Sequence, residues 1–148
     1  MSWTSPPDKV TECRDGMILC AGAATLGCST SGFYHYPEAG LKTTALPFCI
    51  LTEGEDYQAE RHAPGESYGV GSVRGTFYLD PATTTIGQAE QACRELVHQL
   101  AELQGDNLFI TSATRSLASR VRRSKIAATN DGAARSYFTI QVTVSWQG

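Results

Sequence analysis

Residues 135–147, RSYFTIQVTVSWQ, alternate strictly between apolar and polar side chains. A side-chain repeat of two residues is typical of a β-strand with one buried face. The sequence therefore predicts a strand here, in which Tyr137 and the polar residues after it face away from the core. The side chains expected to enter the core are Phe138, Ile140, Val142, Val144 and Trp146.

An amphipathic helix that starts at Ile86 is the element with the clearest boundary signals. Thr85 can cap its N-terminus, and Gln88 three residues later completes a capping box. Gly105 is the expected C-terminal stop. The apolar stripe predicts that this helix packs on a sheet whose other side is in water. The stripe consists of Ile86, Ala89, Cys93, Leu96, Val97, Leu100 and Leu103.

Weaker patterns predict four more elements. A first helix is expected over residues 9–25 and a buried strand over residues 47–52. A longer strand is expected over residues 68–79, where three glycines suggest a bulge or a twist. A short strand is expected over residues 108–111.

Together these elements predict an α/β (α+β) fold in a single domain that spans residues 1–148. Its centre is a mixed, largely antiparallel β-sheet of about four strands, packed by two main helices and carrying two long charged loops or arms. The expected core comprises Met17, Phe48, Ile50, Phe77, Leu79, Ile86, Ala89, Cys93, Leu96, Leu100, Leu108, Ile110, Phe138, Ile140, Val142 and Val144.

Charge is segregated into two stretches that lack sustained hydrophobic periodicity and are therefore expected to be loops or arms. Residues 53–66 carry five acids and one base, whereas residues 107–130 carry five bases and no acid. Arms of opposite sign suggest a subunit that associates head to tail with copies of itself. The candidate interface residues are Glu53, Glu55, Asp56, Glu60, Arg115, Arg120, Arg122, Arg123 and Lys125.

Other interpretations of the charged stretches stay open. The basic stretch could contact nucleic-acid phosphates, although no aromatic residues are interleaved for base stacking. It could also be a solvated loop. A metal or acid/base site around His62, with Glu60 and Glu66, is a further alternative to a solvated loop histidine.

The five cysteines are expected to be reduced, cytosolic thiols that act as small core residues. Cys13, Cys20, Cys28 and His35 cluster in sequence but lack a CxxC pair, so a zinc site is not expected. No P-loop or nucleophile-elbow motif is present, and we expect neither catalysis nor a cofactor. No run of 18 apolar residues exists, so no membrane span is expected, and the N-terminus predicts no signal peptide.

The order of the predicted elements resembles that of the tail-terminator (minor tail, neck) proteins of tailed bacteriophages. Residues 34–50, YHYPEAGLKTTALPFCI, are similar to that family's approach to its first strand. Residues 73–79 resemble its long second strand. Residues 86–112 and 137–146 resemble its helix, following strand and closing strand.

The resemblance implies a homohexameric ring that caps the tail tube, stops its polymerisation and joins the tail to the head-side connector. The implied partners are other copies of the chain, the tail tube protein and connector or adaptor proteins. DNA would pass through the lumen without sequence-specific binding. Such a protein is made in the host cytoplasm and resides in the virion, and the family offers no catalytic residues. The alternatives are a nucleic-acid-associated accessory protein that uses residues 115–125, and a small hydrolase or metal protein around His62.

Overall fold

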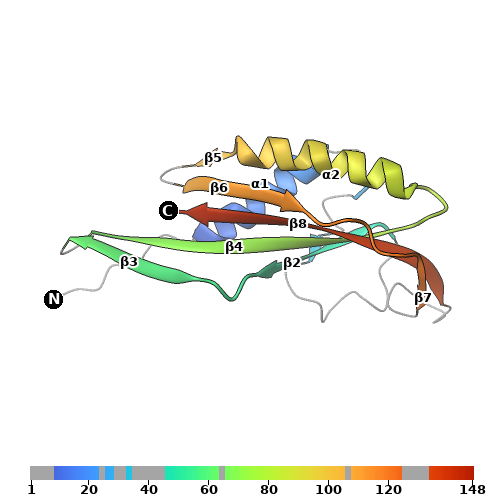
Figure 1. Cartoon of the computed structure of the whole chain (residues 1–148), viewed down its shortest axis with the longest axis horizontal. Helices are drawn as coiled ribbons and strands as arrows, with labels where there is room; N and C mark the ends of the chain where they lie inside the picture. The colour runs from blue at the N-terminus through green and yellow to red at the C-terminus, as the bar shows by residue number, and fades with distance from the viewer. Residues whose placement is uncertain are drawn as a thin grey trace.

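Two helices cover one face of a β-sheet in the computed structural model (Figure 1), as the sequence predicts. Helix α1 spans Lys9–Ala23 and helix α2 spans Ile86–Ala101. The structure describes residues 9–23, 26–28, 33–34, 46–63, 66–105, 108–124 and 134–148. No helix among these residues is long and apolar enough to cross a membrane.

The described strands form a mixed, largely antiparallel sheet, which confirms the predicted fold class. Their order is β1-β2-β4-β8-β6-β5, with β3 paired to β4 and β7 paired to β8. The pairing of β1 with β2 is parallel, and the other pairings are antiparallel. The bounds are β1 Phe33–Tyr34, β2 Phe48–Glu53, β3 Gln58–Ala63, β4 Glu66–Leu79, β5 Gln104–Gly105, β6 Leu108–Arg115, β7 Arg122–Ser124 and β8 Arg135–Gln147.

The sheet is organised around four long runs of chain. Strands β4 and β8 form the centre and pair continuously from Val70–Gln147 to Leu79–Phe138. Strands β2 and β3 lie end to end beside β4, while β6 and β7 lie end to end beside β8. The described strands outnumber the roughly four that the sequence predicts. The additional strands arise because both outer runs are interrupted and because β1 and β5 have two residues each.

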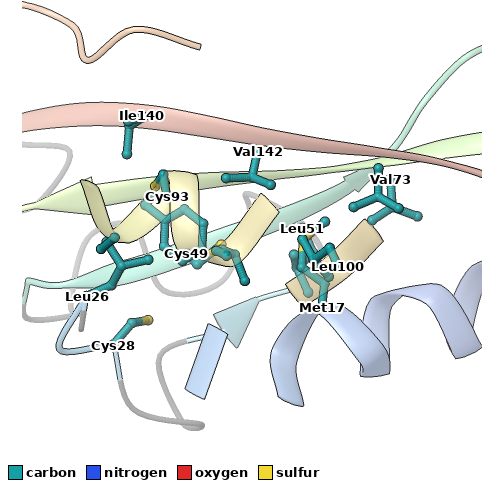
Figure 2. Packing of buried hydrophobic residues seen from close by; sticks show 14 of the residues in the cluster. Met17, Leu26, Cys28, Cys49, Leu51, Val73, Cys93, Leu100, Ile140 and Val142 are labelled. Atoms are coloured by element: carbon teal, nitrogen blue, oxygen red, sulfur yellow. The ribbon is translucent and has the colours of Figure 1, made fainter. Parts of the chain in front are cut away.

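The main core lies between the sheet and the two helices (Figure 2). The predicted inward face of β8 is confirmed, because all five of its expected core side chains are buried. Helix α2 begins with the predicted capping box, in which the Gln88 amide donates to Thr85 Oγ1 at 3.2 Å and the Thr85 amide donates to Gln88 Oε1 at 3.0 Å. Its buried residues are Ala89, Ala92, Cys93, Leu96 and Leu100.

Two details predicted for α2 are wrong. The helix ends at Ala101 with Glu102 as its C-cap, and Gly105 lies in β5 rather than forming the stop. Ile86 is 39% exposed at the first position of the helix, and the buried residues of α2 begin at Ala89. Ile110, also expected in the core, is only partly buried against it.

Strand β2 contributes to both faces of the sheet. Cys49 and Leu51 enter the main core, whereas Phe48 and Ile50, which the sequence placed there, form a second buried cluster. Phe48 stacks on Tyr78 with ring centroids 4.7 Å apart. A run of four buried residues cannot reveal which alternate residues face the helices.

The second cluster also explains why Tyr137 is buried although it faces away from the main core. Its ring centroid lies 5.7 Å from that of Tyr78, and only 6% of the residue is exposed. Away from this cluster the same face carries half-buried threonine, serine and glutamine side chains of β8. The expected solvated side of the sheet is therefore polar along part of its length.

The glycines of β4 make space for large side chains, and of the bulge or twist suggested for them no bulge is seen in the pairing with β8. The β4–β8 register has no shift. A Cβ atom on Gly71 would lie 3.1 Å from the Trp146 ring, and one on Gly75 would lie 2.9 Å from Met17 Sδ. These glycines therefore permit close approach of the core to the strand backbone.

The cysteine thiols are free, and four of the five cysteines are buried. Burial raises the pKa of Cys13 and Cys93 to about 12 and that of Cys28 to about 11, and it raises the pKa of Cys49 well above its ordinary value. The cause is desolvation, which disfavours the thiolate. These thiols are therefore poor nucleophiles at neutral pH.

We expect the free energy of unfolding to fall as the pH rises above 9, the ordinary thiol pKa. Above pH 9 the thiols of the unfolded chain lose their protons, whereas the buried thiols of the folded chain keep theirs until the pH approaches their raised pKa values. The stability that is present below pH 9 is therefore lost as the pH rises through this window. Each such thiol contributes at most about 1.4 kcal/mol per pH unit. Urea melts across this range measure the slope, and Cys93→Ala should make it shallower. An unchanged slope in that variant would show that Cys93 titrates alike in both states.

Candidate intersubunit edges of the sheet

The acidic stretch is an interrupted outer strand of the sheet and not the loop that the sequence suggested. Glu53 pairs with Val73 and Gln58 pairs with Val70. Between these pairs, the four residues 54–57 lie opposite the two β4 residues 71–72, so the outer strand has two additional residues. The surplus turn is tied to β4, because Ser72 Oγ donates to Asp56 Oδ1 at 2.8 Å and the Gly54 amide donates to the Ser72 carbonyl at 2.9 Å. We call residues 53–63 the acidic edge.

The acidic edge ends in a two-stranded arm. The last hydrogen bonds between β4 and the end of the β8 run join Gly69 and Gly148. Beyond them, β3 and β4 pair with each other. Glu60 accepts hydrogen bonds from Gln58 Nε2 at 2.7 Å and from the Tyr68 hydroxyl, and the latter bond raises the pKa of Tyr68. The carboxylate of Glu60 therefore fixes side chains on the arm.

The basic stretch is also an outer strand, with β6 continuing to Arg115 and β7 starting at Arg122. Arg115 pairs with Val142 and Arg122 pairs with Tyr137. Between these pairs, the six residues 116–121 lie opposite the four β8 residues 138–141, so this part of the outer strand also has two additional residues. We call residues 108–124 the basic edge. The expected loop is wrong for residues 112–115 and 122–124, which are in strands. Residues 116–121 are irregular, as expected, and residues 125–130 lie outside the described residues.

Two serines hold the interrupted part of the basic edge against β8. The Ser116 amide donates to the Gln141 carbonyl at 2.8 Å, and the Gln141 amide donates to Ser116 Oγ at 2.9 Å. The Ser119 amide donates to the Thr139 carbonyl at 2.8 Å, and the Thr139 amide donates to Ser119 Oγ at 2.8 Å. Each hydroxyl accepts a bond that a strand carbonyl would otherwise accept.

Replacing Ser119 with alanine should lower the free energy of unfolding by roughly 0.5–1.5 kcal/mol, because the Thr139 amide loses its acceptor. Urea denaturation measures the change. Ser136→Ala, at an exposed position of β8, is the matched control and should change stability by less than about 0.5 kcal/mol. Equal effects of the two substitutions would contradict the bridging role of Ser119.

The two edges lie on opposite sides of the sheet, separated by β4 and β8. Figure 1 also shows the β3–β4 arm and β7 at opposite ends of the long axis. Among the described residues the one ion pair is Lys9–Glu12, at 3.1 Å. The candidate acids and the described candidate arginines therefore do not neutralise each other within one chain.

The structure places most of the candidate interface residues on exposed positions. Glu53, Glu55, Asp56 and Glu60 are exposed on the acidic edge. Arg115 is half-buried, with Nη1 donating to the Ser116 carbonyl at 3.2 Å. Lys125 lies outside the described residues. The exposed basic residues are Arg120, Arg122 and Arg123.

The sequence shows apolar residues in the basic stretch but does not indicate that they form part of a candidate interface. Leu117 is 75% exposed, Phe109 63% and Val121 49%. Their irregular spacing gives no strand or helix period, so only the pairing with β8 reveals that they share one edge. Exposed apolar residues beside arginines are a frequent composition of protein interfaces.

The alternative metal or acid/base site around His62 receives no support from the described residues. His62 lies in β3 and Glu66 begins β4, but their side chains are outside the described part, as is His35. Among the side chains that are described, no group of three His, Cys, Asp or Glu residues could hold a metal ion.

A scan of protein-family models and a search of curated proteins each found no match to this chain.

Proposed function

We propose that this chain is a structural subunit of a bacteriophage tail that assembles into a ring, caps the tail tube and joins the tail to the head-side connector. The observation that carries the proposal is the separation of opposite charges onto opposite edges and ends of one sheet. Such a subunit presents two different, complementary surfaces. Repetition of a heterologous contact closes into a ring when its rotation divides a full turn.

The resemblance to tail terminators supplies the biological setting of this ring. It implies six copies, contacts with tube and connector proteins, and a lumen through which DNA passes. It also implies a protein without catalytic residues or a cofactor, located in the tail or neck of the virion.

A nucleic-acid-associated role is the second candidate, because Arg120, Arg122 and Arg123 are exposed and pair with no described acid. Clustered arginines can displace counterions from phosphates. The net charge of −3 and the apolar residues among these arginines favour a protein partner.

Negative-stain electron microscopy of the purified full-length chain tests the proposal. We expect closed rings of uniform diameter with a central hole. Open filaments would show that the contact is heterologous but does not close, and would contradict the capping function. Particles of single-subunit size, together with salt-dependent binding to duplex DNA, would favour the second candidate.

A further inference from the structure

Both outer edges of the sheet have long segments with no neighbouring strand in the described part of the chain. Strand β1 borders β2 only at Cys49 and Ile50, and β5 borders β6 only at Leu108 and Phe109. No described strand lies on the outer side of β3, or of β6 beyond Phe109. Such edges present unpaired backbone donors and acceptors that can template a strand from another chain.

The β3–β4 arm lies beyond the paired part of β8 and exposes its outer strand. Residues 58–61 are all exposed, and the arm extends past the last hydrogen bond to the β8 run. A two-stranded hairpin alone is marginally stable in water. Addition of a further strand to β3 would extend the sheet on the side where no described strand lies.

The charges select which edges can meet. Soluble proteins often place charges on edge strands to prevent pairing with other chains. Here one edge is acidic and the other is basic, so two acidic edges or two basic edges repel each other, whereas unlike edges attract. The lengths also match, since β3 has six residues and the open segment of β6 runs from Ile110 to Arg115.

We infer that the outer edge of β3 in one copy of this chain pairs with the outer edge of β6 in the next copy, so that one sheet continues across the subunit boundary. The flanking acids at 53–56 would then lie near the arginines at 115–123 of the neighbour. The inference rests on the proposed self-assembly and names the surfaces that carry it.

Disulfide trapping between two different variants tests the pairing. Gln58 lies opposite Val70 on the face of the sheet away from the helices, and Thr114, which pairs with Thr143, lies on the same face. The variants Gln58→Cys and Thr114→Cys are purified separately, mixed at low salt and oxidised mildly. Ser112 lies two residues before Thr114 on the same face of the sheet. The variant Ser112→Cys therefore tests a pairing register that is shifted by two residues.

A covalent dimer should form in the mixture of Gln58→Cys with Thr114→Cys or Ser112→Cys, and be absent from each variant alone. The control variant Gln99→Cys, at an exposed position of α2, should give no dimer with Gln58→Cys. Dimers in Gln58→Cys alone would show that like edges meet and would overturn the inference. Rings without a mixed dimer would overturn the edge pairing while leaving the proposed function intact. Absence of any assembly would overturn both.

Hydrogen exchange of the unmodified protein provides a second readout. Amides in residues 58–61 and 110–115 should be protected at least about tenfold more in the assembly at low salt than in protein dissociated by added salt. Assembly without this added protection would contradict the pairing. Protection of residues 110–115 by added duplex DNA instead of by a second copy would assign the basic edge to nucleic acid.

Discussion

Replacing Leu100 with alanine is expected to lower the free energy of unfolding by roughly 2–5 kcal/mol, the usual range for truncating a buried leucine. Leu100 is fully buried on α2 and belongs to the same core cluster as Met17 and Leu51 (Figure 2). Truncation removes contacts and leaves a cavity between the helical layer and the sheet. Urea denaturation followed by circular dichroism measures the loss.

Leu19→Ala is the matched control for this prediction. Leu19 is the same residue type in a helix of the same layer, but it is 74% exposed. Its truncation should change the free energy of unfolding by less than about 0.5 kcal/mol. If Leu100→Ala cost less than about 0.5 kcal/mol as well, the assignment of the buried face of α2 would be wrong.

Reversing Arg122 and Arg123 to glutamate is expected to weaken assembly strongly at low salt. The substitutions replace attraction to an acidic neighbour by repulsion. An exposed ion pair contributes up to about 1 kcal/mol, so losing the attraction and adding the repulsion should weaken the free energy of each subunit contact by roughly 1–4 kcal/mol. Light scattering measures the shift of the assembled mass toward that of the single chain, 15.9 kDa. High salt should reduce the difference from the unmodified protein.

The opposite reversal allows a complementation test. Glu55→Lys with Asp56→Lys makes the acidic edge basic, and this variant should also fail to assemble alone. In a mixture of the two double variants, glutamates at 122 and 123 of one subunit can face lysines at 55 and 56 of the other. The two unmodified edges can also face each other, so assembly should return in alternating order. Combining all four substitutions in one chain should restore it in part.

The control for the charge reversals is Arg74→Glu with Arg94→Glu, which changes the net charge equally at exposed positions of β4 and α2. This variant should retain the mass of the unmodified assembly. An Arg122 and Arg123 reversal that leaves the assembled mass unchanged at low salt would contradict contact between the two edges.

The interior of the fold could be predicted because its signals are local. Strict alternation in residues 135–147 identifies β8 and its buried face, and Thr85 with Gln88 identifies the start of α2. The face of β2 could not be predicted, because Phe48, Cys49, Ile50 and Leu51 are all apolar and all buried. Only their pairing with β4 distinguishes the two sides of that strand.

The candidate site could be predicted in composition but not in structure. The sign of each charged stretch is evident in the sequence, and so is the suggestion of head-to-tail contact. Their strand character is not evident, because residues 58–61 are exposed on both faces and so lack a buried face to impose alternation. In the basic edge, Ser116 and Ser119 maintain the pairing across an interruption through their side chains.

Assembly through two unlike edges of the sheet into a closed ring can be tested by the molar mass of the full-length protein. Light scattering measures this mass over a wide range of concentrations at low salt. We expect one discrete mass that is a fixed multiple of 15.9 kDa, six-fold as the resemblance implies, and that decreases as salt is added. A mass of 15.9 kDa at every concentration would contradict it, as would a mass that grows without limit.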